Sequence, residues 1–488
     1  MSPPPGLADA VAEPLRDIGD VVRLIEALVA AESSRSRPPD ALALQPMSDL
    51  LARIGNPQRA LRCIHVAGSK GKGSTALLCE AVLGAAGLRV GTYTSPHLQR
   101  WSERYRVGGQ EVGEAEFVAA VERVRPHFVE LQDNAHPPGF FDFATATAFA
   151  LFENTRADVA LIEVGLGGSL DPTNVITPLV SCITSIELEH TDRLGTTLAA
   201  IAREKAGIIK PAVPVVIGDL PREALAVIEA QATNWAAPLH RLGIDFTANV
   251  TRTSADGVAM HVECGPLAMD LTLPVLGPHL AGNAAMALAC ILHAELLPLP
   301  ELADAARRGL AQVALPGRTE ILGRRPWIVA DGAHTESSAR ALMHSLDVLD
   351  CRERHMVISI SSGKDLAGLL PIFAAKASAF VVTRADRQRS LEPSAIADWI
   401  RQHFPGLPVH AVDDPLAAVS ETLARVPSDS LMCVTGSVYA AGAARTALAS
   451  SPTDLKPALS SPAGAAHCTH ENAALQSGYC ATGIGRLM

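Results

Sequence analysis

Residues 65–82, "HVAGSKGKGSTALLCEAV", contain the turn on which the expected fold depends. A β-branched run that ends at about Ala67 predicts a strand, and an Ala/Leu-rich helix should begin near Thr75. Between them lies a glycine-rich turn, which is the setting in which backbone N–H groups and a helix N-terminus bind phosphate. The usual pattern places Gly-Lys directly before Ser or Thr, whereas here Gly73 separates Lys72 from Ser74. The stretch predicts a phosphate-binding loop, and the alternative is a glycine-rich surface turn.

Beyond this loop, short apolar runs alternate with helical stretches along the chain. The runs "LRCIHVAG", "LRVGTYTS", "ADVALIEVG", "LVSCITSI" and "VPVVIGD" are typical of buried parallel strands, so we expect an α/β fold with a mostly parallel sheet covered by helices. The alternation of strand-like and helix-like stretches is interrupted between Leu273 and His279. A further alternation after this point predicts a smaller α/β domain. We expect an N-terminal phosphate-binding domain over residues 1–275, which includes a helical segment at its start, and a C-terminal domain over 276–447. Residues 448–488 are rich in Ser, Ala, Pro and Gly and are expected to be a disordered tail, in which His467, Cys468, His470 and Cys480 are not expected to bind metal.

Composition excludes several classes of function. A chain of 488 residues is long for one domain, and 48% hydrophobic content is enough for packed cores. The 4% aromatic content and the net charge of -10 argue against a nucleic-acid partner. The nine cysteines form no Cys-x-x-Cys pair, so we expect reduced, mostly buried thiols. The N-terminus lacks the pattern of a signal peptide and no stretch is apolar for long enough to cross a bilayer, so we expect a cytoplasmic protein without a membrane partner.

Several motifs that flank and follow the loop occur in a recognisable order. They are "LLARIGNPQRALRCIHVAG", "GTYTSPHLQRWSERYRVGG", "FFDFATATAFALF", "ADVALIEVGLGGSLDPTNVI", "ITSIELEHTDRLGTTLAAIAREKAGIIKP", "LPGRTEIL", "VADGAHTESSARAL" and "TGSVYAAGAAR". In this order, over roughly residues 20–447, the chain resembles the folylpolyglutamate synthase and dihydrofolate synthase family of the Mur ligase superfamily. The resemblance implies a Mur-ligase-like central ATPase domain followed by a Rossmann-like C-terminal domain.

The resemblance also implies an ATP-dependent amide ligase that joins L-glutamate to a carboxylate of dihydropteroate or of a reduced folate through an acyl phosphate. Both partners in the first step are anions, so metal ions and cationic groups must reduce their repulsion. The implied catalytic residues are Lys72, Glu163, His190 and Lys205. The implied ligands of two Mg²⁺ ions are Ser74, Ser95, Glu163, His190 and Lys205. The implied ATP contacts are Gly68, Gly71, Lys72, Gly73, Ser74, Thr75, Asn283, Arg318, Asp331 and His334.

Lys205 has a special expected role. The resemblance implies that its amine is carbamylated by CO₂, because an unmodified lysine beside Mg²⁺ would repel the ion. The alternative is an exposed helical lysine that pairs with Glu204 or a neighbour. Lys364, in "SSGKDLAGLL", is similar in position to a family lysine, and a loop cation is an equal alternative.

Six positions depart from the family's usual residues. Lys70 replaces Asn, Asp142 replaces Glu, Ser169 replaces Arg, Pro172 replaces Ala, Glu189 replaces Asp, and Thr335 replaces Asn. Since the phosphate lysine, the metal carboxylate and the metal histidine remain, we expect an active ligase. The alternatives are a paralogue that glutamylates another carboxylated cofactor and a non-catalytic nucleotide-binding protein. The resemblance favours a monomer.

Overall fold

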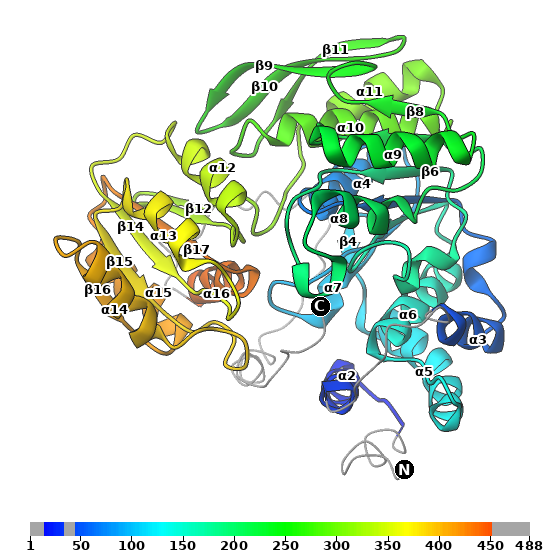
Figure 1. Ribbon diagram of the computed structural model, residues 1–488, viewed down its shortest axis with the longest axis horizontal. Coiled ribbons are helices and arrows are strands. Elements are labelled where there is room, and N and C mark those ends of the chain that lie inside the picture. Colours follow the sequence, from blue (N-terminus) through cyan, green and yellow to red (C-terminus); the bar gives the residue numbers. More distant parts are fainter. Residues whose placement is uncertain (1–13, 34–43, 451–488) are drawn as a thin grey trace.

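The computed structural model describes residues 14–33 and 44–450, which form two α/β lobes side by side (Figure 1). The expected tail therefore lies outside the described residues from 451 onward, whereas residues 448 and 449 belong to the last helix, α16 (Val438–Ala449). Within the described part of the chain, no helix is both long and apolar enough to cross a membrane.

The N-terminal lobe is built on an eight-stranded sheet. Its order is β4 (Gln110–Glu111), β3 (Tyr105–Val107), β2 (Val90–Tyr93), β5 (Val159–Glu163), β1 (Cys63–Ala67), β6 (Val180–Ile183), β7 (Val215–Ile217) and β8 (Leu239–Arg241). Strands β2, β5, β1, β6, β7 and β8 pair in parallel in that order, whereas β3 and β4 form an antiparallel extension beside β2. Every residue of β1 is buried, as expected of a central parallel strand covered on both faces.

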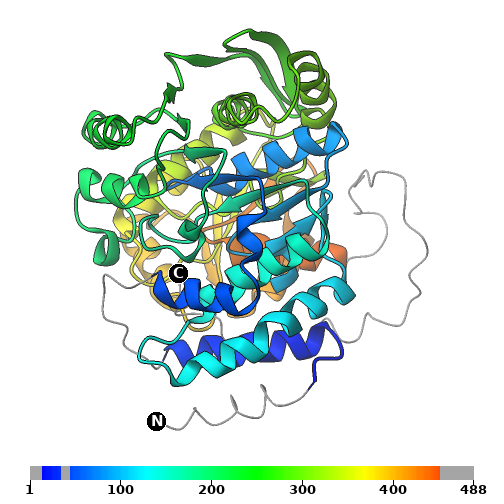
Figure 2. The same ribbon diagram turned by 90° about the vertical axis from the view of Figure 1, so that its right-hand side faces the viewer.

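Helices cover both faces of this sheet (Figure 2). They are α2 (Ile18–Ser33), α3 (Gln45–Arg53), α4 (Lys72–Ala85), α5 (Glu114–Glu130), α6 (Phe140–Asn154), α7 (Thr191–Leu194), α8 (Leu198–Ala206) and α9 (Arg222–Asn234). Helix α4 starts at Lys72, three residues earlier than the sequence predicts, because Gly71 takes a left-handed conformation (φ 86°) that ends the turn. Helix α8 begins where the Thr197 hydroxyl accepts the N–H of Ala200 at 3.1 Å.

A three-stranded antiparallel sheet lies at the top of Figure 1. It consists of β9 (Phe246–Ser254), β10 (Gly257–Cys264) and β11 (Leu267–Leu273), and it packs with α10 (Leu280–His293) and α11 (Leu299–Leu310). Both helices also pack against α4. The contact with α11 is close, since a Cβ on Gly309 would lie 2.2 Å from the carbonyl oxygen of Ala81. The domain boundary at residue 275 stays a prediction, but α10 and α11 pack on the N-terminal lobe although they follow that boundary.

The C-terminal lobe contains a six-stranded sheet. Its order is β12 (Glu320–Arg324), β13 (Trp327–Ala330), β17 (Leu431–Thr435), β14 (Arg354–Ile358), β15 (Ala379–Val382) and β16 (Val409–Ala411), parallel except for the β12–β13 pair. The helices of this lobe are α12 (Glu336–Leu346), α13 (Leu366–Ala374), α14 (Pro393–His403), α15 (Pro415–Arg425) and α16. Two separate apolar clusters fill the two sides of the sheet. The expected α/β architecture with mostly parallel sheets is confirmed; the β9–β11 sheet is an antiparallel addition that the sequence analysis missed.

Candidate active site

The phosphate-loop candidate connects β1 to α4 at the carboxyl edge of the eight-stranded sheet. Gly68 has a φ of 145°, a conformation that a residue with a side chain rarely adopts. The Lys72 ammonium folds back and donates to the carbonyl oxygen of Gly68 at 2.8 Å. The Ser74 side chain is buried at the first turn of α4. This is the expected strand, turn and helix arrangement.

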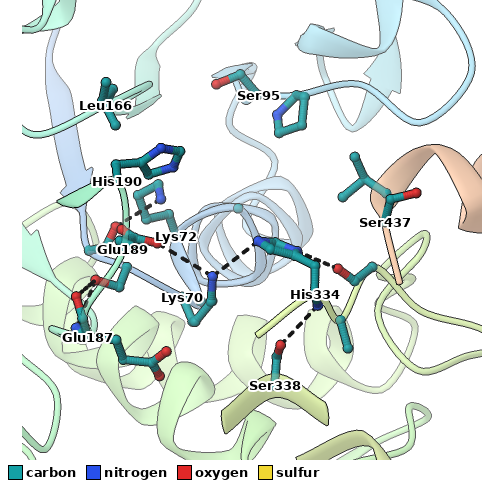
Figure 3. Close-up of a pocket in the computed structure, with 18 of the residues that line it drawn as sticks. Lys70, Lys72, Ser95, Leu166, Glu187, Glu189, His190, His334, Ser338 and Ser437 are labelled. Carbon is teal, nitrogen blue, oxygen red and sulfur yellow. Dashed lines mark hydrogen bonds and ion pairs between the residues drawn. The ribbon is translucent and has the colours of Figure 1, made fainter. Parts of the chain in front are cut away.

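The two residues that follow strand β6 hold the loop in place through hydrogen bonds. The N–H of Lys70 donates to Ser185 Oγ at 2.8 Å, and the Ser185 hydroxyl donates to the carbonyl oxygen of Lys70 at 3.1 Å. The Thr184 hydroxyl donates to the same Lys70 oxygen and also lies 3.3 Å from the carbonyl oxygen of Ala67. The backbone of the loop is therefore held from a neighbouring strand, and the Lys70 side chain points into the cleft (Figure 3).

Glu163, the last residue of β5, brings a carboxylate to the loop. Its side chain is buried and accepts the N–H of Ser95 at 2.9 Å. A Cβ on Gly73 would lie 3.3 Å from Glu163 Oε2, so the glycine leaves room for the carboxylate beside the loop. Burial raises the pKa of Glu163, and the Lys72 charge is the largest of the effects that oppose this rise. Glu163 is therefore not a strand-end carboxylate that faces solvent.

Glu189 connects two lysines in the pocket. Its Oε1 accepts from Lys205 Nζ at 3.1 Å. Its Oε2 lies 3.4 Å from Lys70 Nζ, and Figure 3 shows this second contact. Burial favours the neutral acid, but Lys72, Lys205 and Lys70 together hold the pKa of Glu189 at about 2. Lys205 also donates to the carbonyl oxygen of Gly68 at 3.0 Å and is 1% exposed, with a pKa lowered by burial to about 8. Lys205 is therefore not the exposed helical lysine of the alternative interpretation.

The C-terminal lobe supplies the opposite wall. The Asp331 carboxylate accepts the N–H groups of Thr319 and Ala333, both at 2.7 Å. His334 donates from Nδ1 to the carbonyl oxygen of Gly332 at 2.8 Å, which leaves Nε2 to accept from Lys70 Nζ at 3.3 Å. Burial lowers the pKa of His334 to about 3, in keeping with a neutral ring in this tautomer. The Lys70–His334 contact therefore joins the two lobes across the cleft.

Both lobes line one cavity of about 990 Å³. All but one of the site residues expected from the sequence lie on its wall: Gly68, Gly71, Lys72, Gly73, Ser74, Ser95, Glu163, His190, Lys205, Asn283, Arg318, Asp331 and His334. The exception is Thr75, which is fully buried behind the loop. Asn283 reaches the loop from α10, since a Cβ on Gly71 would lie 2.9 Å from its Oδ1. Lys364 also lines the cavity. Residues about 260 positions apart in the chain thus meet in one pocket.

The oxygen atoms around Glu163 fit a magnesium ion. Carboxylate and hydroxyl oxygens are ligands that Mg²⁺ accepts, and Glu163, Ser74 and Ser95 all line the cavity. The Ser95 hydroxyl is buried without a hydrogen-bond partner, which is an unsatisfied donor-acceptor group beside a carboxylate. Among the described residues, no cluster of three or more His, Cys, Asp or Glu side chains is placed to hold a metal. Any Mg²⁺ here would therefore depend on hydroxyl, phosphate and water oxygens as well.

Some residues of the cavity were absent from the sequence-based site. Val29, Trp101, Arg104, Phe140 and Tyr439 also line it. Lys70 and Glu189 stand out in the sequence only as departures from the family pattern, yet Glu189 contacts both Lys70 and Lys205. Nothing in the local sequence shows that these side chains face the pocket, although Trp101 and Arg104 lie within a motif that carried the resemblance.

Two lobes, a phosphate loop and a shared cleft define a nucleotide-dependent ligase of the Mur type, and comparison with known proteins agrees. Residues 142–291 match the Mur ligase middle domain, and residues 317–438 match the Mur ligase, glutamate ligase domain. The chain belongs to the folylpolyglutamate synthase and dihydrofolate synthase family, whose members are ATP-dependent ligases.

The family relatives match over most of this chain. The folylpolyglutamate synthase of Lacticaseibacillus casei is 35% identical over 405 residues, which are 82% of this chain and 92% of that protein. A probable bifunctional folylpolyglutamate synthase/dihydropteroate synthase of Haloferax volcanii is 34% identical, but the chain spans only 47% of its length. The solved structure of Mycobacterium tuberculosis folylpolyglutamate synthase complexed with ADP has a TM-score of 0.80 at 32% identity, covering 88% of this chain and 98% of that one. The E. coli FolC structure in complex with DHPP and ADP has a TM-score of 0.76 at 28% identity, covering 89% and 98%.

Proposed function

We propose that this ligase joins L-glutamate to dihydropteroate, forming dihydrofolate, and that it extends reduced folates with further glutamates. Relatives that carry the names dihydrofolate synthase and folylpolyglutamate synthase support both activities. The observation that carries the proposal is the single cavity, in which the phosphate loop and Glu163 of one lobe face Arg318, Asp331 and His334 of the other. We also propose that the protein acts as a monomer in the cytoplasm, where its thiols stay reduced; all seven cysteines in the described residues are free.

In the first step of the proposed reaction, an acceptor carboxylate oxygen attacks the γ-phosphorus of ATP, and ADP leaves. The N–H groups at the start of α4 and the Lys72 ammonium would hold the phosphates, and the Arg318 guanidinium would bind them from the other lobe. Glu163, Ser74 and Ser95 would hold Mg²⁺, with His190 and Lys205 near a second ion. Bound Mg²⁺ would supply positive charge against the phosphate oxygens.

In the second step, the glutamate amine attacks the acyl carbon, inorganic phosphate leaves, and the nitrogen loses a proton to form the amide. An acyl phosphate that met water would hydrolyse first, so the site must exclude water. The lobes already meet through the Lys70–His334 contact and through the Ser337 hydroxyl, which donates to Glu187 at 2.6 Å. These contacts support a reaction that takes place between closed lobes.

The carbamate on Lys205 is a separate part of the proposal. Carbamylation needs an unprotonated amine, and the pKa of about 8 supports a substantial neutral fraction at pH 8. The competing partner is Glu189, which already neutralises the ammonium. A ¹³C NMR spectrum of the protein in ¹³C-bicarbonate should show one carbamate signal that Lys205→Met removes; a spectrum without that signal would overturn this part.

The whole proposal is tested by measuring ADP release with ATP, Mg²⁺ and L-glutamate, with dihydropteroate or a reduced folate as the acceptor. Products weighed by mass spectrometry should gain one glutamate per ADP. Turnover of dihydropteroate alone would leave dihydrofolate synthase as the only activity. Turnover of neither acceptor, with ATP still bound, would instead favour a paralogue with another carboxylated acceptor.

A further inference from the structure

Arg104 is a buried arginine that forms no ion pair within the described residues. It ends the short 3₁₀ turn Trp101–Arg104 that precedes β3, and it is 3% exposed. Its Nε donates to His97 Nδ1 at 3.1 Å, and its guanidinium carbon lies 4.4 Å from the centre of the Trp101 ring. Its Nη1 is buried without a hydrogen-bond partner. By contrast, Arg106, two residues later, pairs with Glu80 at 2.9 Å.

An unpaired guanidinium in this position is costly. An arginine side chain stays charged in proteins, and a desolvated charge without a counter-ion is strongly unfavourable. His97 offers no negative charge, because an imidazole is either neutral or positive; burial lowers the pKa of this ring well below its ordinary value, which favours the neutral form. The Trp101 ring contributes only a cation–π contact, which is weaker than an ion pair with a carboxylate. Among the described residues, the fold thus keeps a buried positive charge with no ion-pair partner at contact distance.

The surroundings of Arg104 point to the missing partner. Arg104 lines the shared cavity together with Val29, Trp101, Phe140 and Tyr439, a largely apolar and aromatic end of the pocket. This end is continuous with the phosphate loop and Glu163. Glu163 lines the same cavity, and the Arg104 charge is one of those that oppose the burial-driven rise in the pKa of its carboxyl group. A flat aromatic molecule that carries a carboxylate would suit both the rings and the charge.

We propose that Arg104 binds the carboxylate of the pterin-bearing acceptor and holds it toward the phosphate loop. The inference rests on the proposed function, because it assigns the acceptor's charge to one residue of the same site. A carboxylate that entered the cavity beside this side chain would supply the counter-ion that Arg104 lacks among the described residues. L-glutamate also carries carboxylates and is the competing source of the same chemistry, but it has no ring to pack against Trp101 and Phe140.

The test is a binding measurement without ATP, so that it does not depend on turnover. Isothermal titration would compare dihydropteroate with its uncharged carboxamide, on wild-type protein and on Arg104→Gln. Wild-type protein should prefer the carboxylate by about 100-fold, because the carboxamide would leave the buried guanidinium without a charged partner. Arg104→Gln should reduce the preference to less than about fivefold, and Arg104→Lys should retain part of it because the charge remains.

The matched control is Arg106→Gln, which removes an arginine two positions away whose partner, Glu80, is known. It should keep the wild-type preference. Thermal melting of each variant reports whether it folds, and the carboxamide comparison on folded Arg104→Lys keeps the test decisive should Arg104→Gln fail to fold. An unchanged carboxylate preference in the Arg104 variants would overturn the inference, as would loss of L-glutamate binding with acceptor preference intact. If the preference depends on Arg104 but the wild type releases no ADP, the inference stands and the proposed function fails.

Discussion

Gly68→Ala is the sharpest structural test of the phosphate loop. The added Cβ would lie 2.0 Å from Thr184 Oγ1, far inside van der Waals contact. The alanine would also have to adopt a φ of 145°. Backbone strain of this kind costs about 1–3 kcal/mol. Displacing Thr184 would break its hydrogen bonds to the carbonyl oxygens of Lys70 and Ala67, at about 0.5–1.5 kcal/mol each. Together these effects predict that the free energy of unfolding falls by about 2–6 kcal/mol.

Urea unfolding followed by circular dichroism measures this loss, and titration with ATP reports the loop itself. The Kd for ATP should rise at least tenfold, because the displaced backbone no longer presents its N–H groups to the phosphates. Gly84→Ala is the matched control: it lies in α4, nothing is within 4 Å of its Cβ position, and the change should stabilise the helix by up to about 1 kcal/mol. A Gly68→Ala protein as stable as wild type, with unchanged ATP affinity, would refute this account of the loop.

Three further predictions concern single side chains. Lys72→Ala should lower kcat for ADP release by about 10²–10³, while the exposed control Lys376→Ala leaves it unchanged; equal rates would remove Lys72 from the phosphate site. Glu189 has a pKa of about 2, below its ordinary 4.5, so its stabilisation is present above pH 4.5 and is lost as the pH falls toward 2. Urea unfolding should therefore show that the free energy of unfolding falls less between pH 6 and pH 3 for Glu189→Gln than for wild type. An equal fall in both proteins would contradict the ion-pair network. Brief alkylation followed by peptide mapping should label Cys351 before Cys63 and Cys264, because burial raises the pKa of those two thiols to about 12 and about 11; early labelling of Cys63 would show that the sheet opens.

The sequence predicts the parallel strands well, because parallel strands that are buried on both faces appear in a sequence as continuous apolar runs. Strand β5, "VALIE", is such a run, and its final Glu163 follows the rule that ligand-binding groups lie at the carboxyl ends of strands. The β9–β11 sheet was missed although β11 alternates strictly between buried and exposed residues, from Leu267 to Leu273. That period of two was available in the sequence and is typical of a sheet with one solvated face.

The candidate site was predicted mainly through the family motifs, and their limits are physical. Whether Lys205 is buried depends on Glu189, a partner 16 positions earlier, and on the oxygen of Gly68, 137 positions earlier. Arg104 lies beside Arg106, and only the tertiary structure shows that one arginine has a carboxylate partner and the other does not. Local patterns place residues on strands and helices, but they do not reveal which charges are balanced.

The packing of α10 and α11 on α4 has a consequence for the order in which the protein is made. Helix α4 begins with Lys72, yet its apolar side is covered by helices that end only at Leu310. While the chain emerges from the ribosome, the eight-stranded sheet can be complete before that cover exists, and Leu78, Val82 and Leu83 would then face water. The ability to hold a nucleotide should therefore arise late in synthesis. Nascent chains released before residue 310 should depend most on chaperones, even though the phosphate loop itself was translated more than 200 residues earlier.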